Sequence, residues 1–372
     1  MKRRDFIRQA GAGSLAVGAA GLLTACGKEQ SMQEVEAKAP QQHFAWKMVT
    51  TWPKNFPGLG TSAEKLAELI TEMSGERLRV KVYGANELVP AFEVFDAVSR
   101  GTAELGHGAA YYWKGKSEAA QFFSTVPFGM TAQEMNGWLY YGDGLKLWRE
   151  LYRQFGLIPA PAGNTGVQMG GWFNKEINSV ADLQGLKMRI PGLGGEVLKR
   201  AGGTPVNLPG GELFTSLESG AIDATEWVNP YNDLAFGLYK AAKYYYYPGF
   251  HEPGTTLEAI INQAAFEGLP KDLQAIVLNA CKVVNQDMLA EYTARNPAAL
   301  KALIEKHHVE VRAYPEDVLA TLRKYSEEVV KELADKDDFA KRVYTSYSAF
   351  LQGCREWGRL SDIAYLRARD GI

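Results

Sequence analysis

Hydrophobic and polar positions alternate along the chain with two different periods. Phe44–Trp52 and Arg77–Tyr83 have the two-residue period of strands, whereas Thr61–Met73 has apolar residues at helical spacing and is followed by Gly75. Strands and helices that follow one another in this way favour mostly parallel sheets flanked by helices. Further strands are predicted at Ala103–Gly106, Leu157–Pro161, Gln168–Phe173, Leu186–Ile190 and Ile222–Trp227, and further helices at Pro90–Ser99, Gly144–Gln154, Glu196–Ala201 and Glu212–Ser219.

Two stretches of the chain share one pattern. Glu93–Leu105 reads EVFDAVSRGTAEL, and Glu212–Ala224 reads ELFTSLESGAIDA. In each stretch a helical run ends at a glycine, and a strand follows that carries an acid near its start. This internal repeat predicts two similar lobes that face each other across a cleft, as in a hinged binding protein.

The pattern changes near Pro270. From there to the C-terminus, Leu, Ala, Lys and Glu recur at helical spacing with few interruptions. The expected fold is therefore α/β, the two-lobed fold of a hinged binding protein with long C-terminal helices. Within residues 44–372, the first lobe is expected mainly at 44–160, the second mainly at 161–262, and a helical segment at 263–372.

The N-terminal residues predict export and lipidation. A twin-arginine motif at Arg3–Arg8, a mildly apolar run and a lipobox ending at Cys26 follow one another in the order of an exported lipoprotein. Residues 1–26 are therefore predicted to be a signal that leaves Cys26 lipidated, and residues 27–43 a polar tether. The mature protein is expected in the periplasm, held at a membrane by its lipid.

Composition excludes several other classes. The 41 basic and 43 acidic residues leave a net charge of −2 without a basic block, which argues against nucleic acid as a partner. Three cysteines are too few for a disulfide framework. Cys281 and Cys354 are expected as small buried side chains or, alternatively, as a pair.

The motifs of common enzyme classes are weak in this chain. None of the 5 histidines has the i, i+4 partner that a zinc-binding helix needs. Ile190–Glu196 follows a strand and opens a helix, as a dinucleotide loop does, so an exported oxidoreductase is the alternative reading. Pro191 interrupts the expected junction, and the glycines more simply let a backbone approach a small anion at a helix N-terminus.

Three polar residues stand in otherwise apolar strands. Arg189 ends its strand, where ligands bind in α/β folds, and a guanidinium there matches a carboxylate; a structural salt bridge is the other interpretation. Gln168 and Glu226 offer amide and carboxylate oxygens of the kind that hard cations take. Hydrogen bonds to neighbouring loops would explain these two equally well.

Four segments carry a family resemblance. Gly163–Phe173, Leu183–Arg189, Ala221–Val228 and Tyr244–Gly249 resemble the substrate-binding subunits of tripartite ATP-independent periplasmic (TRAP) transporters. The similarity extends over almost all of the chain after Trp46 and is greatest for the subgroup that binds 2-oxo acids such as pyruvate, or lactate. The lipobox departs from the usual freely soluble member.

The resemblance implies a role for particular residues. Arg189 matches the arginine that clamps the substrate carboxylate, and Tyr112 and Asn164 match residues that hydrogen-bond the substrate. Gln168, Glu226, the carbonyl of Trp227, and Glu252 match the ligands of a cation, Na⁺ or Ca²⁺, that bridges protein and substrate.

The resemblance also implies a transport function without a chemical step. The protein is expected to capture a small 2-oxo or 2-hydroxy monocarboxylate and deliver it to the membrane permease subunits. Close relatives exchange a C-terminal helix, so a homodimer is expected. A ligand sensor of the same fold is a further alternative.

Overall fold

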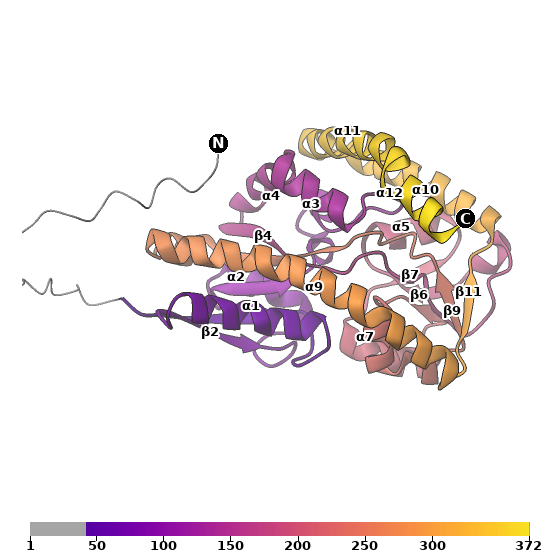
Figure 1. Ribbon diagram of the computed structural model, residues 1–372, viewed down its shortest axis with the longest axis horizontal. Helices are drawn as coiled ribbons and strands as arrows, with labels where there is room; N and C mark the ends of the chain where they lie inside the picture. The colour runs from indigo at the N-terminus through magenta and orange to yellow at the C-terminus, as the bar shows by residue number, and fades with distance from the viewer. Residues whose placement is uncertain (1–41, 372) are drawn as a thin grey trace, which may run out of the picture. The chain divides into compact units, whose positions relative to one another are not determined.

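In the computed structural model, which describes residues 42–371, the chain forms two β-sheets with helices around them (Figure 1). These residues belong to one compact unit. The predicted signal and the lipidation of Cys26 lie outside the described residues.

The first sheet has 5 strands in the order β2-β1-β3-β10-β4. β1 pairs in parallel with β2 and β3, whereas β10 runs antiparallel between β3 and β4. β10 is buried along almost its whole length, as a central strand covered on both faces should be. The bounds are β1 (Phe44–Thr50), β2 (Leu78–Tyr83), β3 (Leu105–Gly108), β4 (Leu157–Asn164) and β10 (Thr256–Asn262).

The second sheet has 6 strands in the order β11-β9-β5-β8-β6-β7. β6 is parallel to β7 and β8, and β5 runs antiparallel between β8 and β9. The sheets are thus mixed rather than mostly parallel, because β5 and β10 are each reached by a segment that crosses from the other sheet. The bounds are β5 (Gly171–Phe173), β6 (Lys187–Arg189), β7 (Thr204–Val206), β8 (Ala224–Thr225), β9 (Tyr244–Tyr247) and β11 (Glu310–Ala313).

The two sheets repeat one arrangement. The order β2-β1-β3-β10-β4 corresponds to β7-β6-β8-β5-β9, with an antiparallel strand at the fourth place in both. The repeated sequence pattern lies at equivalent positions. In both copies a six-residue helix, α2 (Val94–Ser99) or α6 (Leu213–Glu218), precedes a glycine with a positive φ, 75° at Gly101 and 71° at Gly220. The two-lobed α/β fold predicted from the sequence is confirmed.

The acids of the repeat have the same structural role. The Glu104 carboxylate accepts a hydrogen bond from the backbone N–H of Lys47 at 2.7 Å. In the second lobe, Asp223 accepts one from the backbone N–H of Lys187 at 2.9 Å. Each acid therefore ties the strand that follows the repeat to the neighbouring parallel strand of its sheet.

The chain crosses between the sheets along residues 165–170, along residues 248–255 and along α9 (Lys271–Glu305). The expected lobe ranges therefore do not coincide with the sheets. β10, expected in the second lobe, pairs in the first sheet, and β11 interrupts the expected helical segment and pairs in the second. Two polar residues also lie outside the strands in which they were predicted. Gln168 precedes β5, and Glu226 follows β8.

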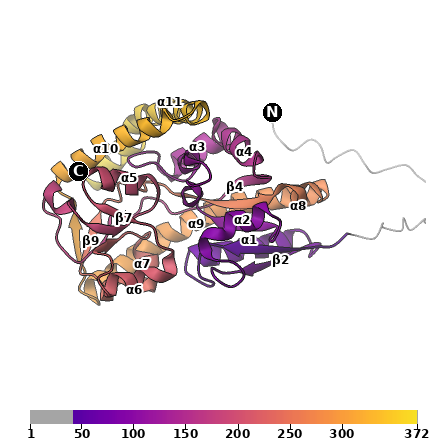
Figure 2. The same cartoon turned by 180° about the vertical axis from the view of Figure 1, so that it is seen from behind.

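The long helix α9 runs beside both lobes (Figures 1 and 2). Its buried residues Leu273, Val277, Cys281, Val284 and Met288 recur at helical spacing. It packs against α1 and β4 of the first lobe and against α7 of the second. Cys281 and Cys354 form no disulfide with each other among the residues that the structure describes.

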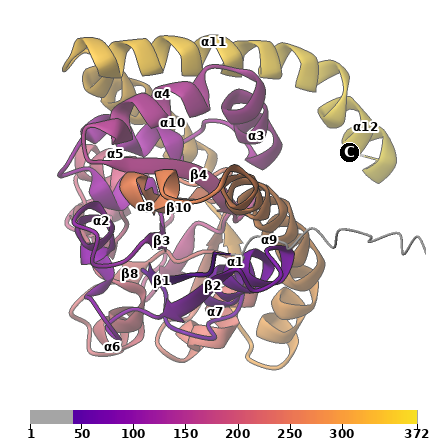
Figure 3. The same cartoon turned by 90° about the vertical axis from the view of Figure 1, so that its left-hand side faces the viewer.

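The C-terminal helices connect the lobes a second time. α10 (Glu316–Ala334) packs against α5 of the second lobe, whereas α11 (Asp338–Leu360) packs against α3 and α4 of the first. Figure 3 shows α11 continuing past the body into α12 (Asp362–Asp370), none of whose residues is buried. Within residues 42–371, no helix combines the length and the apolarity of a membrane span.

The remaining helices flank the sheets. They are α1 (Leu59–Met73), α3 (Ala132–Tyr141), α4 (Gly144–Arg153), α5 (Gly192–Arg200), α7 (Pro230–Phe236) and α8 (Gln263–Glu267). Short 3₁₀ turns lie at Ala91–Glu93, Ala110–Trp113, Glu118–Phe123, Val180–Leu183, Gly210–Glu212 and Leu238–Lys240.

Candidate functional site

Arg189 is the last residue of β6 and is buried. Its guanidinium pairs with Glu226, which directly follows the neighbouring parallel strand β8. Its Nε donates to the carbonyl of Leu208 at 3.0 Å, and a terminal nitrogen donates to the Tyr112 hydroxyl at 3.4 Å. The carboxyl ends of parallel strands meet at one edge of a sheet, which is why two residues 37 positions apart form an ion pair.

Gln168 and Glu252 lie on the two crossing segments, 165–170 and 248–255. The backbone N–H of Gln168 donates to the Glu252 carbonyl at 3.1 Å, and Gly249 donates to the Gln168 carbonyl at 2.8 Å. The side-chain amide of Gln168 also donates to a Glu252 carboxylate oxygen at 2.7 Å. The crossing segments therefore hold each other and carry an amide and a second carboxylate to the site.

Two buried oxygen atoms at this place lack a hydrogen bond within the described part of the chain. Among residues 42–371, neither Oε2 of Glu226 nor Oε1 of Gln168 has a hydrogen-bond partner. Buried polar atoms are rarely left without one, and carboxylate and amide oxygens are ligands for hard cations such as Na⁺ and Ca²⁺. The donor set thus fits a cation.

The charges at the site also favour a cation. Burial first, and then the neighbouring Glu226 carboxylate, raise the pKa of Glu252 to about 7. Burial alone would lower the pKa of the Arg189 guanidinium, but Glu226 beside it raises that pKa above its ordinary value. The positive charge of Arg189 is therefore paired with Glu226. Glu252 is buried, at 2% exposure, next to this second carboxylate.

The other predicted site residues differ in what they contact. Tyr112 of the first lobe reaches Arg189, as described above. The Trp227 ring is buried, with the Arg189 guanidinium carbon 5.2 Å from its centroid. Asn164, at the end of β4, donates to the Gly254 carbonyl at 3.2 Å and accepts from the Gly166 N–H at 2.9 Å. These bonds join Asn164 to the crossing segments.

His251 is at the site, although the sequence analysis gave it no role. Glu226, His251 and Glu252 each offer an atom that could bind a metal, and these atoms lie within 4.8 Å of one another. His251 Nε2 is 3.5 Å from Glu226 Oε2. Its place next to the predicted ligand Glu252 is the sequence signal that could have identified it.

The glycine-rich start of α5 has a packing role. A Cβ on Gly194 would lie 2.8 Å from the Cβ of His251, and one on Gly192 would lie 3.2 Å from the Cβ of Tyr111. Gly192 also has a positive φ of 60°. The glycines therefore let α5 approach the site closely, which accounts for the Ile190–Glu196 motif without a dinucleotide.

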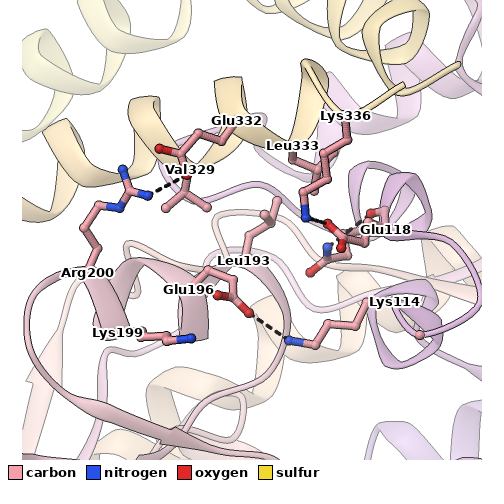
Figure 4. Close-up of a pocket in the computed structure, with 12 residues that line it drawn as sticks. Lys114, Glu118, Leu193, Glu196, Lys199, Arg200, Val329, Glu332, Leu333 and Lys336 are labelled. Atoms are coloured by element: carbon pink, nitrogen blue, oxygen red, sulfur yellow. Dashed lines mark hydrogen bonds and ion pairs between the residues drawn. The ribbon is translucent and has the colours of Figure 1, made fainter. Parts of the chain in front are cut away.

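Two cavities lie between the lobes, and one of them borders this cluster. One, of about 420 Å³, is lined by Tyr111, Tyr112, Ile190, Val206 and Asn207 among others, and it borders the Arg189 site through Tyr112. The second, of about 600 Å³, lies among the segment from Lys114 to Gln121, α5 and α10, and is lined by charged side chains (Figure 4). Lys114 of the first lobe and Glu196 of the second line both cavities and pair across the lobes at 3.1 Å.

This geometry agrees with the family to which the sequence is similar. Residues 48–337 match the model of the bacterial extracellular solute-binding protein family 7 (DctP). The chain belongs to this family. The predicted resemblance to TRAP solute-binding proteins is confirmed, and the family supports the transport reading over an oxidoreductase.

Other members resemble the chain over nearly its whole length. A monocarboxylate 2-oxoacid-binding periplasmic protein of Nostoc sp. is 43% identical over 365 residues, which are 98% of each chain. A TRAP periplasmic solute-binding protein of Pseudoalteromonas atlantica, solved with bound sodium and pyruvate, is 45% identical, with a TM-score of 0.85, and the match covers 88% of this chain and 99% of that one. A TRAP solute-binding protein of Bordetella bronchiseptica is 37% identical, with a TM-score of 0.87 over 89% of this chain and 98% of that one; its structure is a mixed-occupancy dimer with copurified calcium and picolinate.

We expect Arg189→Met to lower the free energy of unfolding of the ligand-free protein by about 3–5 kcal/mol, because it leaves the Glu226 carboxylate buried without a counter-charge. The double variant Arg189→Met, Glu226→Gln should recover most of this loss. Urea unfolding followed by tryptophan fluorescence measures both. Lys301→Met, which breaks an exposed pair with Glu305, is the control and should change nothing. A loss below about 1 kcal/mol in the single variant would contradict a buried pair.

Proposed function

We propose that the protein captures a small 2-oxo or 2-hydroxy monocarboxylate, such as pyruvate or lactate, together with Na⁺ or Ca²⁺, and delivers it to the membrane permease of a TRAP transporter. The observation that carries the proposal is a buried cluster of one guanidinium and two carboxylates, in which oxygen atoms of Glu226 and Gln168 lack partners among the described residues. No residue is assigned a catalytic role.

Arg189 is the residue proposed to hold the substrate carboxylate. Its fork of N–H donors can bind a carboxylate through two parallel hydrogen bonds. Glu226 pairs with part of that fork, so a substrate carboxylate would compete with Glu226 for Arg189. Tyr112, whose hydroxyl lies at the same guanidinium, is proposed to bind the substrate from the first lobe.

A cation would remove this competition. When Glu226 turns from Arg189 to a cation, Arg189 becomes available to the substrate. Gln168, Glu226, Glu252 and the carbonyl of Trp227 are proposed to hold the cation, and the substrate would complete its oxygen ligands. Without the cation, two glutamates and a substrate carboxylate would share one arginine in a site with little water, at a cost of several kcal/mol per unpaired ion.

The relatives support this choice of ligands. The Nostoc protein is described as binding monocarboxylate 2-oxoacids, and the Pseudoalteromonas protein holds pyruvate with sodium. The Bordetella protein holds calcium with picolinate, which is also a small monocarboxylate. At 37–45% identity these members are similar enough to this chain to make the same class of ligand the first one to test.

We expect pyruvate to bind at least about tenfold more tightly when Na⁺ or Ca²⁺ is added to chelator-stripped, sodium-free protein. By linkage, pyruvate should strengthen cation binding by the same factor. Isothermal titration in both orders measures the two factors. Glu226→Gln should abolish most of the cation effect, because the amide cannot supply the charge.

Glu258→Gln is the matched control for this experiment. Glu258 is also a buried glutamate, but it accepts from Trp113 inside the first lobe and is not part of the cluster. Its substitution should leave the cation effect intact. Equal affinity for pyruvate with and without every cation tested, in protein that still folds, would contradict the proposed function.

We also propose that export by the twin-arginine route and a lipid on Cys26 hold the protein in the periplasm at a membrane. The support is the order of motifs in residues 1–26. Cys26→Ser should move the protein from the membrane fraction to the soluble periplasm, because acyl chains contribute about 0.8 kcal/mol per buried methylene. Fractionation and intact-mass spectrometry test this, and a wild type that is soluble and lacks lipid would contradict it.

A homodimer through the C-terminal helix is proposed from the exposed end of α11 and from α12. Trp357, Leu360 and Tyr365 are 69%, 79% and 65% exposed, which is high for large apolar side chains. Removing residues 357–372 should therefore yield a monomer. This cut keeps Tyr347, which is buried and accepts from the Met130 N–H, so the body should remain folded. Light scattering of both forms measures the change, and a monomeric full-length protein would contradict the proposal.

A further inference from the structure

His251 is a buried histidine whose ring has no hydrogen-bond partner within residues 42–371. Its exposure is 1%, and neither Nδ1 nor Nε2 has a partner among the residues that the structure describes. The other buried histidine, His107, differs, because its Nδ1 accepts from Trp52 at 2.8 Å and its Nε2 lies 3.0 Å from the Ala162 carbonyl. A buried imidazole without partners is destabilising unless something binds it.

The surroundings of His251 hold it at the two glutamates. Phe250 meets its ring edge-on, with the ring centroids 5.3 Å apart. On another side, the first turn of α5 approaches so closely that Gly194 has no room for a Cβ beside it. Nε2 then lies 3.5 Å from the Glu226 oxygen that has no hydrogen bond. An ion between the carboxylates of Glu226 and Glu252 would therefore have the imidazole beside it.

An imidazole changes which cations a site prefers. Na⁺ and Ca²⁺ take oxygen ligands, whereas Co²⁺, Ni²⁺ and Zn²⁺ gain from a nitrogen ligand, and their affinity for mixed sites rises in the Irving–Williams order. Two carboxylates, an amide oxygen and one imidazole form such a mixed set. With oxygen ligands alone, this advantage of the borderline ions would be absent.

We propose that His251 is a ligand of the cation site, and that it makes the site bind borderline divalent ions more tightly than Na⁺ or Ca²⁺. His251 thereby adds an affinity for borderline ions to a site whose other ligands are oxygen atoms. This inference rests on the proposed function, since it concerns the same site. It adds a ligand and a class of metal to it.

Cobalt is a suitable probe because its visible absorption reports its ligands. Protein without a histidine tag, in which His307 and His308 are replaced by Gln to remove an adjacent pair outside the site, is stripped with chelator and titrated with Co²⁺. The expected result is Co²⁺ binding at least about tenfold tighter than Ca²⁺ binding, with one ion per chain and full displacement by excess Ca²⁺. His251→Gln in the same background should lose about 10- to 100-fold in Co²⁺ affinity while its Ca²⁺ affinity changes less than about threefold, because the amide offers an oxygen in place of the nitrogen.

Two further measurements keep the outcomes separate. His251→Phe should lose Co²⁺ affinity in the same way, and the thermal midpoint of each variant shows whether it is folded. Equal Co²⁺ affinity in the wild type and in both folded variants would overturn the role of His251, as would Co²⁺ that Ca²⁺ does not displace. The pyruvate titrations with Na⁺ and Ca²⁺ are run on the same samples. If they still show the cation effect, only the inference on His251 fails, whereas their failure contradicts the proposed function itself.

Discussion

The structure depends on one constraint: charged side chains are buried between two lobes, away from water. A buried ion is strongly destabilising unless an opposite charge and hydrogen bonds accompany it. Arg189 and Glu226 can therefore be buried only next to each other, and the parallel pairing of β6 and β8 brings them to one edge of the second sheet. Glu252 adds a second negative charge, which Arg189 balances only slightly because it is already paired with Glu226. The donor set at this site therefore fits a cation accompanied by an anionic ligand.

The same constraint explains why the crossing segments carry site residues. Residues 165–170 and 248–255 connect the lobes and hydrogen-bond to each other through the backbones of Gln168 and Glu252. A ligand that engages these two side chains, Arg189 of the second lobe and Tyr112 of the first contacts both lobes and the connection between them. Binding energy can thus be used to hold the lobes together. The Lys114–Glu196 pair and the helices α9 to α11 also span the two lobes.

Arg189, Gln168 and Glu226 were predicted from residue types and their positions along the chain, whereas Glu252, Tyr112 and Asn164 came from the family resemblance. Arg189 and Glu226 follow apolar strands, and the structure brings both to the same place as Gln168, Glu252 and Tyr112. Asn164, which the resemblance places at the substrate, donates to Gly254 and Thr256 and accepts from Gly166, so it joins the crossing segments. His251 was missed, because a single histidine in a loop gives no periodic signal that shows where its ring lies.

The sequence by itself determined the fold class, the internal repeat and most of the strands and helices as far as β8, because these depend on local periodicity, helix-ending glycines and the matching acids Glu104 and Asp223. Tertiary structure alone decided that β10 returns to the first sheet and that β11 joins the second, since a short apolar strand pairs equally well by its own pattern in either sheet. It also decided which polar atoms stay without partners. That property depends on distances of a few ångströms between residues far apart in the chain, such as Glu226 and His251, and only the packed lobes set those distances.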